Sequence, residues 1–216
     1  MPNFIESSPA EDLGELECGG EMTAEHRAVF IQDHNKYRSL VAKGKYTIDA
    51  PSSELRVLPR ASRMIQLKYN CSLEKSALEW AQQAQCGRVH SKDLHVGENM
   101  YRVSSYGSYL DKSFSEVAKQ ATEKWSTEIK KNGASSIDEW NKSIGHATQV
   151  FWADTTTIGC AITRCDDQSM SAICHYYPQG NYRGKQWYKP GETLSECGKY
   201  GESEVAHLDT GLCELQ

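Results

Sequence analysis

Five short motifs place imidazole or carboxylate side chains beside glycine or apolar residues, where such groups can do acid–base or metal chemistry. They contain, in chain order, His34 in HNKYR, His90 in CGRVHS, Glu98 in GENMY, Glu128 in WSTEI and His146 in GHATQVFW. Charged groups inside a protein persist only when they are paired or bound to a metal, so two imidazoles together with two carboxylates suggest a site. The spacing along the chain does not show that these side chains converge.

Each of these residues, taken alone, also has a structural interpretation. His34 lies on an apolar helical stripe, where a hydrogen-bonded core histidine is more common than a ligand. Glu128 alone would belong to a solvated helix face, and Glu98 alone would be a helix cap. Only the combination of the residues indicates a binding or catalytic centre.

Three helices are predicted to carry most of these motifs. Thr23 caps the first helix, whose apolar stripe continues to Gly44. Ser72 caps the second helix, and Ser113 opens the third. On the third helix Trp125 and Glu128 are three residues apart and therefore on one side. The residues expected to face inward are Phe30, His34, Tyr37 and Val41 in the first helix, Leu73, Ala77, Trp80, Ala81 and Ala84 in the second, and Val117, Ala121, Trp125 and Ile129 in the third.

The chain changes character after His146. Two apolar stretches, 158–162 and 172–177, flank the turn-rich segment CDDQSMS, which predicts a β-hairpin. Cys160 and Cys174 stand in these two strands and can bridge them or tie the hairpin to a neighbour. From residue 180 onward the composition turns rich in Gly, Glu and Lys, which predicts a disulfide-stapled tail with little core material.

The composition favours a secreted globular protein. The net charge is −5 and the longest wholly apolar run is VFWA, which argues against nucleic-acid binding and excludes a membrane-spanning helix. Eight cysteines, none in a C-x-x-C pair, favour disulfides and an extracellular location. Glycosylation sequons at Asn70 and Asn141 fit the secretory route. Residues 1–20 are acidic where a signal segment would be basic and apolar, so we expect a mature or recombinant chain.

The motifs stand in the order found in the CAP superfamily, the cysteine-rich secretory, antigen 5 and pathogenesis-related-1 proteins. The chain resembles this family over about residues 24–184, through HNKYR, CGRVHS, GENMY, WSTEI, GHATQVFW followed by IGC, and ICHYYPQGNYRG. The acidic start and the cysteine-containing tail most resemble the activation-associated secreted, venom-allergen-like proteins of parasitic nematodes. The resemblance implies an α+β fold, a three-layer α-β-α sandwich with a central antiparallel sheet stapled by disulfides. We accordingly divide the chain into an acidic N-terminal extension (1–22), a CAP domain (23–184) and a short cysteine-containing C-terminal tail (185–216).

The family's cleft tetrad, carried over by motif, falls on His90, Glu98, Glu128 and His146. Neutral imidazoles with carboxylates suit Zn²⁺, and Mg²⁺ could bind through water and the carboxylates. The resemblance also implies the disulfides Cys86–Cys165 and Cys160–Cys174. The remaining cysteines are available for two further bridges or for a bond between chains in a disulfide-linked homodimer; they are Cys18, Cys71, Cys197 and Cys213.

The resemblance further implies a sterol-binding segment after the Gly-Glu-Asn motif. Tyr101, Tyr106 and Tyr109 have the aromatic spacing of that segment, and the alternative is a tyrosine-rich surface loop. The predicted function is therefore that of a secreted lipid-binding protein, for sterol or fatty acid, that interacts with an unknown host protein and modulates host immunity. The alternative is a metal-dependent hydrolase, or a Ser/His/Glu protease that uses Ser91 beside His90. No nucleophile elbow is recognisable, so no residue is assigned as catalytic.

Overall fold

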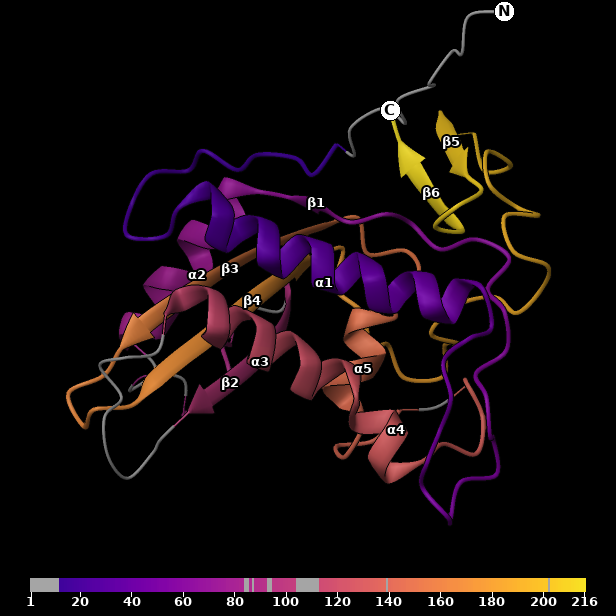
Figure 1. Cartoon of the computed structure of the whole chain (residues 1–216), viewed down its shortest axis with the longest axis horizontal. Helices are drawn as coiled ribbons and strands as arrows, with labels where there is room; N and C mark the ends of the chain where they lie inside the picture. Colours follow the sequence, from indigo (N-terminus) through magenta and orange to yellow (C-terminus); the bar gives the residue numbers. More distant parts are fainter. Residues whose placement is uncertain are drawn as a thin grey trace, which may run out of the picture.

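A computed structural model gives the structure of the chain and describes residues 12–83, 86, 88–92, 95–103, 113–138, 140–201 and 203–216. Figure 1 shows the elements in chain order. The helices are α1 (Ala24–Ala42), α2 (Cys71–Gln83), α3 (Phe114–Ser126), α4 (Glu128–Asn132) and α5 (Gly145–Val150). The strands are β1 (Lys68–Tyr69), β2 (Gly97–Val103), β3 (Thr157–Arg164), β4 (Met170–Tyr177), β5 (Glu204–His207) and β6 (Leu212–Leu215).

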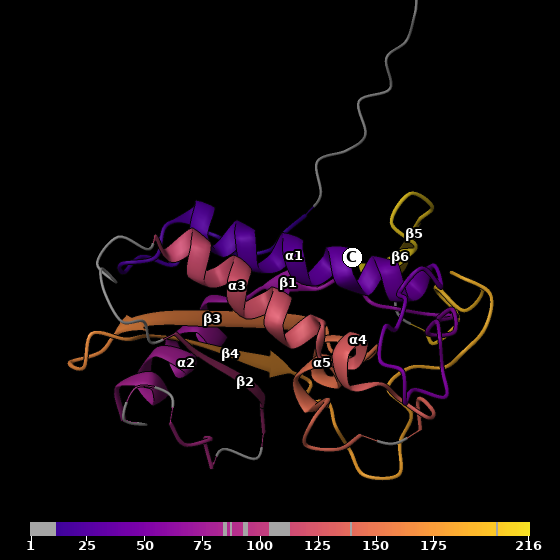
Figure 2. The same cartoon turned by 60° about the horizontal axis from the view of Figure 1, so that its bottom comes forward.

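The chain folds into three layers around a sheet with the strand order β1-β3-β4-β2. The pairs β3–β4 and β2–β4 are antiparallel, and only the two-residue strand β1 runs parallel to its neighbour β3. Figure 2 shows α1 and α3 on one face of this sheet and α2 on the other. The predicted α-β-α sandwich with an essentially antiparallel centre is therefore confirmed.

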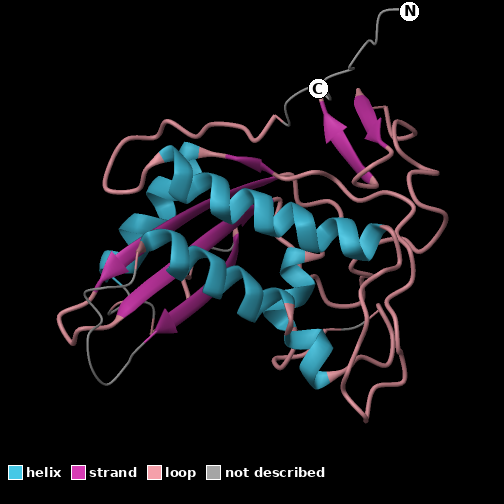
Figure 3. Ribbon diagram, viewed as in Figure 1, coloured by secondary structure: helices cyan, strands magenta, loops and turns pink. Residues whose placement is uncertain are grey.

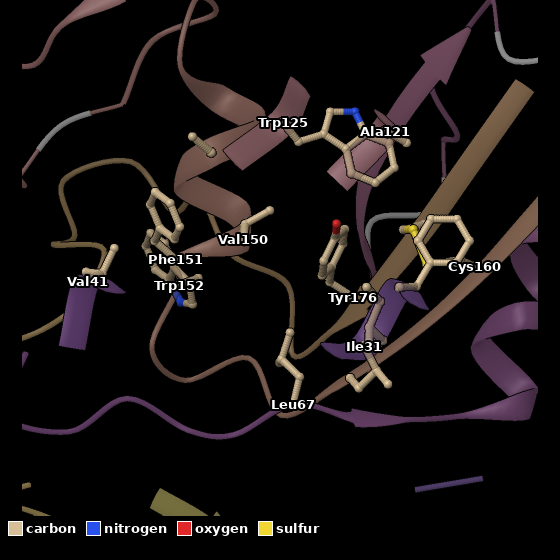
Figure 4. Close-up of a cluster of buried hydrophobic side chains, with 14 of the residues drawn as sticks. Ile31, Val41, Leu67, Ala121, Trp125, Val150, Phe151, Trp152, Cys160 and Tyr176 are labelled. Carbon is tan, nitrogen blue, oxygen red and sulfur yellow. A yellow bond between two sulfur atoms is a disulfide. The ribbon is translucent and has the colours of Figure 1, made fainter. Parts of the chain in front are cut away.

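Each face of the sheet buries its own apolar cluster. The larger cluster joins α1 and α3 to the sheet and includes Phe30, Val117 and Tyr176. Figure 4 shows Tyr176 in this cluster between the segments that carry Trp125 and Ile31. The smaller cluster, under α2, consists of Ala77, Ala81, Ala161 and Ile173. Small residues on both elements let α2 approach the sheet closely. On β3, a Cβ atom at Gly159 would lie 2.1 Å from the backbone nitrogen of Glu74 on α2.

The helix starts follow capping chemistry. Thr23 and Ser113 each accept a hydrogen bond from the third residue of their helix, and that residue's side chain accepts from the cap's backbone N–H. The prediction of Ser72 as the second cap is wrong, because α2 already begins at Cys71. Asn70 takes that role instead, with its Oδ1 3.0 Å from the backbone nitrogen of Leu73.

The predicted third helix is in fact two helices. α3 ends at Ser126, and α4 begins at Glu128 after the turn residue Thr127. Tyr46 contributes to this break, because its hydroxyl oxygen accepts a hydrogen bond from the Lys130 backbone N–H at 3.2 Å. Glu128 therefore starts a new helix whose direction is set by tertiary contacts.

All eight cysteines form disulfides within the chain, so none is free for a bond between chains. The pairs include both bridges that the family resemblance implies. They are Cys18–Cys71, Cys86–Cys165, Cys160–Cys174 and Cys197–Cys213.

The C-terminal segment contributes more to the core than its composition indicates. Trp187 and Tyr188 are 1% and 3% exposed, and Leu212 is fully buried. The hairpin β5–β6, drawn apart from the main sheet in Figure 3, is anchored through Cys213, whose backbone N–H donates to the Met64 carbonyl at 2.9 Å. The expectation of little core material is therefore wrong, whereas the boundary at residue 185 stays a prediction. Within the described residues, no helix is long and apolar enough to cross a membrane.

Candidate functional site

Glu128 and His146 form a hydrogen-bonded pair between α4 and α5. The Glu128 carboxylate accepts from the His146 backbone N–H at 2.9 Å and from Ala147 N–H at 3.1 Å, which satisfies two free N–H groups at the start of α5. Its other oxygen lies 2.6 Å from His146 Nδ1. The Trp125 ring stacks against the imidazole, with 6.4 Å between ring centroids. Glu128 thus holds both the N-terminal end of α5 and the imidazole ring of His146 in place.

His90 and Glu98 form the second pair. Glu98 lies on β2, and one carboxylate oxygen is 2.7 Å from His90 Nδ1 and 2.9 Å from the backbone nitrogen of Ser91. The other oxygen is 3.2 Å from Nε2 of His175, which stands directly opposite Glu98 on β4. His175 Nδ1 is in turn 2.7 Å from the Ser76 hydroxyl on α2. The carboxylate is therefore held between an exposed imidazole and a buried one.

His175 was not among the predicted site residues. It occurs within ICHYYPQGNYRG, which served only as a family motif, and its role depends on the register that puts Glu98 opposite it. A strand residue flanked by apolar neighbours gives no sequence signal of such pairing. Its side chain is 2% exposed.

The electrostatics of this second pair favour an ionised carboxylate. Burial alone would raise the pKa of Glu98, but hydrogen bonds with His175, His90 and the Ser91 amide lower it to about 2. The hydrogen bond to Glu98 raises the pKa of His90, against a smaller lowering by burial. The pair is thus poised to keep Nδ1 of His90 protonated and directed at the carboxylate.

Position 97 requires glycine because there is no room for a side chain, and not because the backbone there must be flexible. A Cβ atom at Gly97 would lie 2.0 Å from Oε1 of Gln149, which is on α5 with His146. The same Gln149 oxygen accepts the Gly180 backbone N–H at 2.9 Å. The glycine therefore lets β2 approach α5 closely, which brings the strand of the second pair next to the helix of the first.

Asn99, the neighbour of Glu98 on β2, contacts the first pair through its side-chain amide. Its Nδ2 lies 3.1 Å from the His146 carbonyl oxygen and 3.1 Å from the Tyr176 hydroxyl. The Tyr176 hydroxyl also lies 2.9 Å from Nε2 of His34, whose Nδ1 is 2.7 Å from the Phe30 carbonyl. Burial lowers the pKa of His34 to about 4, so this ring is neutral and donates from Nδ1 to the carbonyl. The structural interpretation of His34 is confirmed.

The four tetrad residues form two pairs and not one compact cluster of ligand atoms. In the part of the chain that the structure describes, the one group of three or more donor atoms within 4.8 Å of one another is Cys197, Glu204 and Cys213. Two of these atoms are the sulfurs of one disulfide, which are not available as thiolate ligands. That group is therefore no metal site.

The predicted sterol-binding tyrosines are only partly described. Tyr101 lies on β2, half-buried against the larger core cluster, with its hydroxyl 3.4 Å from Oε1 of Gln120. Burial raises the pKa of Tyr101. Tyr106 and Tyr109 lie outside the described residues.

Comparison with known proteins places the chain in a family. The model of the cysteine-rich secretory protein family, named CAP, matches residues 31–177, which carry all four tetrad residues. The chain belongs to the CAP family. Its CAP domain is similar to the Ancylostoma secreted protein of Ancylostoma caninum, with 33% identity over 201 residues that cover 89% of this chain and 45% of the relative.

Two further similarities support the same family. Venom allergen 5 of Polistes dominula is 33% identical over 184 residues, covering 79% of this chain and 78% of the relative. The crystal structure of NaASP2 with Zn²⁺ matches with a TM-score of 0.76 and 28% identity, covering 93% of this chain and 99% of that one. The predicted similarity to nematode venom-allergen-like CAP proteins is confirmed. The chain spans less than half of the length of the Ancylostoma secreted protein.

Proposed function

We propose that the chain is a secreted CAP-domain binding protein that holds a divalent metal ion between the imidazoles of His90 and His146. One observation carries the proposal: both rings present Nδ1 to a glutamate carboxylate, at 2.7 and 2.6 Å. Among the described residues no partner contacts Nε2 of either ring. A histidine ligand commonly donates its second N–H to a carboxylate, which fixes the ring and makes the free nitrogen a better donor.

This arrangement assigns the carboxylates a supporting role. Glu98 and Glu128 each hold a ring through Nδ1, and Glu128 also accepts two backbone N–H groups. The imidazole Nε2 atoms would then bind the ion, and water would complete its coordination. When bound, the ion would act as a Lewis acid toward its water ligands.

The donor set favours Zn²⁺ over Mg²⁺. Neutral imidazole nitrogen is a common zinc ligand, whereas Mg²⁺ prefers carboxylate and water oxygens. Both glutamates already accept short hydrogen bonds from their histidines, and Glu98 accepts a further one from His175. A magnesium site would have to break these bonds. The NaASP2 structure with Zn²⁺, 28% identical to this chain, supports the same choice.

Titration calorimetry with Zn²⁺ tests the metal site. The wild-type chain should bind one ion, and the His90→Ala, His146→Ala double variant should lose this binding. Glu98→Gln and Glu128→Gln should each weaken affinity by about 10–100-fold without abolishing it, because they remove a residue that orients a ligand.

A matched control is available in His207, a histidine that also contacts a glutamate. Its Nε2 lies 2.7 Å from Oε2 of Glu214, so the nitrogen proposed as the metal ligand in His90 and His146 is already engaged in His207. His207→Ala should leave Zn²⁺ affinity unchanged. Equal affinity in the wild type and the His90/His146 double variant would reject the proposed site.

The secretion and host-interaction parts of the proposal rest on family membership. The relatives bear names such as Ancylostoma secreted protein and Venom allergen 5. Four disulfides fit an oxidising extracellular compartment. We propose that the chain acts outside the cell on a host protein and modulates host immunity.

Lipid binding, to sterol or fatty acid, is a second part of the proposal, supported by the tyrosine spacing from residue 101. Fluorescent sterol binding should weaken when Tyr101, Tyr106 and Tyr109 are replaced together by serine. Because Tyr101 packs against the core, the Tyr106→Ser, Tyr109→Ser double variant should show most of the loss. The exposed Tyr182 and Tyr200, replaced together, serve as the control. Unchanged binding in the double and triple variants would exclude this segment as the sterol site.

The hydrolase alternative has less support. Glu98 contacts the ring of His90 and the backbone nitrogen of Ser91, and its second oxygen contacts His175. A serine protease needs the hydroxyl aimed at the imidazole and donors for an oxyanion. Peptide cleavage that depends on His146 would favour this alternative.

A further inference from the structure

The outer edge of β3 is only partly covered. β1 pairs with Thr157 and Ile158 at the start of β3 and then ends, while β3 continues to Arg164. The other edge of β3 is paired with β4 along its whole length. A strand edge without a neighbour presents a row of backbone N–H and C=O groups that can pair with another chain.

The direction of these backbone groups follows from the pairing register. Cys160 stands opposite Cys174 with 4.0 Å between Cα atoms, the close spacing of a pair whose backbone groups point away from each other. The Tyr69 hydroxyl confirms this direction, because it accepts the Cys160 N–H at 3.1 Å and lies 2.9 Å from the Cys160 carbonyl oxygen. With the two-residue period of a strand, Ile162 and Arg164 direct their backbone groups to the same side.

The backbone of Ile162 faces a pocket and finds no partner there among the described residues. Tyr69 covers Cys160, but no described residue hydrogen-bonds the backbone of Ile162 or Arg164 on this side. A pocket of about 810 Å³ opens at this edge, within the size range of ligand sites. Its apolar walls are Met22 before α1 and Leu78 and Ala81 on α2. Leu78 is 37% exposed although it is a large apolar side chain.

The charges at the rim of this pocket are paired with one another. Arg88 and Arg102 both contact Asp167, the former at 3.0 Å, and Arg164 lies 3.5 Å from Glu21. The Arg164 guanidinium also lies over the Phe114 ring. Asp166 also lines the pocket, so three arginines stand against three carboxylates at the rim. The rim therefore offers no surplus positive charge for a phosphate or a fatty-acid carboxylate. The unused recognition groups are the backbone donors and acceptors of β3 and the apolar walls.

We propose that this pocket binds an extended peptide segment of a partner protein, which adds to the free edge of β3 as a further strand. Peptide backbone is the chemistry that matches alternating N–H and C=O groups spaced along a strand, and strand addition is a common mode of peptide recognition. An apolar side chain of the peptide lies between Met22 and Leu78. The proposal is independent of the metal site, which occupies other residues.

A labelled peptide of alternating threonine and valine, acetylated and amidated at its ends, is the probe. Fluorescence anisotropy should show saturable binding to the wild-type chain, and the same peptide methylated on every backbone nitrogen should bind at least about tenfold more weakly. Methylation removes the donors but keeps the apolar side chains. Hydrogen exchange at the Ile162 amide should be fast in the free protein and slow in the complex.

Leu78→Glu tests the apolar wall, and Val205→Glu on β5 is the matched control, since Val205 is 43% exposed and lies away from the pocket lining. Leu78→Glu should weaken binding about tenfold, and Val205→Glu should leave it unchanged. The proposal would be overturned if the unmodified probe did not bind saturably, or if the methylated peptide bound equally well. It would also be overturned if Leu78→Glu left binding unchanged, or if hydrogen exchange at the Ile162 amide did not slow in the complex.

Discussion

Replacement of Arg38 by methionine should lower the free energy of unfolding by about 4 kcal/mol or more. Arg38 is completely buried, and burial lowers its pKa to about 9. Its guanidinium donates to carbonyl oxygens from two separate segments, at distances of 2.6–3.3 Å. The acceptors are the carbonyls of Ile65, Val150, Trp152, Ala153 and Thr155.

Methionine fills much of the same space but supplies no donor. The Trp152 and Ala153 carbonyls still accept a backbone N–H. Within the described residues, the carbonyls of Ile65, Val150 and Thr155 are left without a donor. Each buried acceptor that loses its partner costs about 1–3 kcal/mol, and removal of the buried charge offsets part of the sum. The loss should also disturb the segment that follows α5, and with it the position of His146. Arg38 thus connects α1 to the segment on which half of the site depends.

Equilibrium unfolding in guanidinium chloride measures this effect. Arg38→Lys should be intermediate, because an ammonium group supplies three donors and no planar fork. Arg183→Met, at an exposed position, is the control and should change stability by less than about 0.5 kcal/mol. A loss below about 1 kcal/mol for Arg38→Met would contradict this role.

Breaking the buried pair Arg27–Glu74 should cost about 3–5 kcal/mol. The guanidinium is 1% exposed and contacts both carboxylate oxygens, with Nε–Oε2 and Nη2–Oε1 distances of 2.6 and 2.7 Å. It also donates to the carbonyls of Leu16 and Gly19, so it ties the segment before α1 to α2. The pair raises the pKa of Arg27.

A double-mutant cycle separates the pair energy from general damage. Arg27→Met and Glu74→Leu should each be strongly destabilising, and the double variant should be clearly more stable than the sum of both losses predicts, because neither partner remains as an unpaired buried charge. The exposed pair Lys130–Asp49, at 3.4 Å, is the control and should give a coupling energy below about 1 kcal/mol. Additive losses at Arg27 and Glu74 would mean that the pair is not a coupled unit.

Local chemistry in the sequence predicted the helices that begin with a capping residue. Thr23 and Ser113 lie at their predicted positions because a cap depends on residues only three apart. The break after Ser126 was not predictable in this way. Its causes are distant, namely Tyr46 against the Lys130 backbone and α5 against the Glu128 carboxylate. The helical spacing of apolar residues continues through this break, because Trp125 and Ile129 are both buried.

The candidate site was predictable in its residue types but not in its organisation. Family motifs identified His90, Glu98, Glu128 and His146, and the structure groups them as two pairs held by Nδ1. The contribution of His175 depends on strand register, which the sequence of a buried strand does not encode locally. The uncovered edge of β3 also depends on strand pairing. It could not be predicted from the sequence, because it follows from the end of β1 at Tyr69.

Anomalous diffraction from crystals grown with Zn²⁺ tests the proposed metal site most directly. The predicted result is one strong zinc peak within bonding distance, about 2.1 Å, of Nε2 of both His90 and His146. Glu98 and Glu128 should remain hydrogen-bonded to Nδ1 of their rings. A zinc peak away from these rings, or one bound by the glutamate oxygens with the Nδ1 contacts broken, would contradict the assignment of the two imidazoles as ligands and the two carboxylates as their supports.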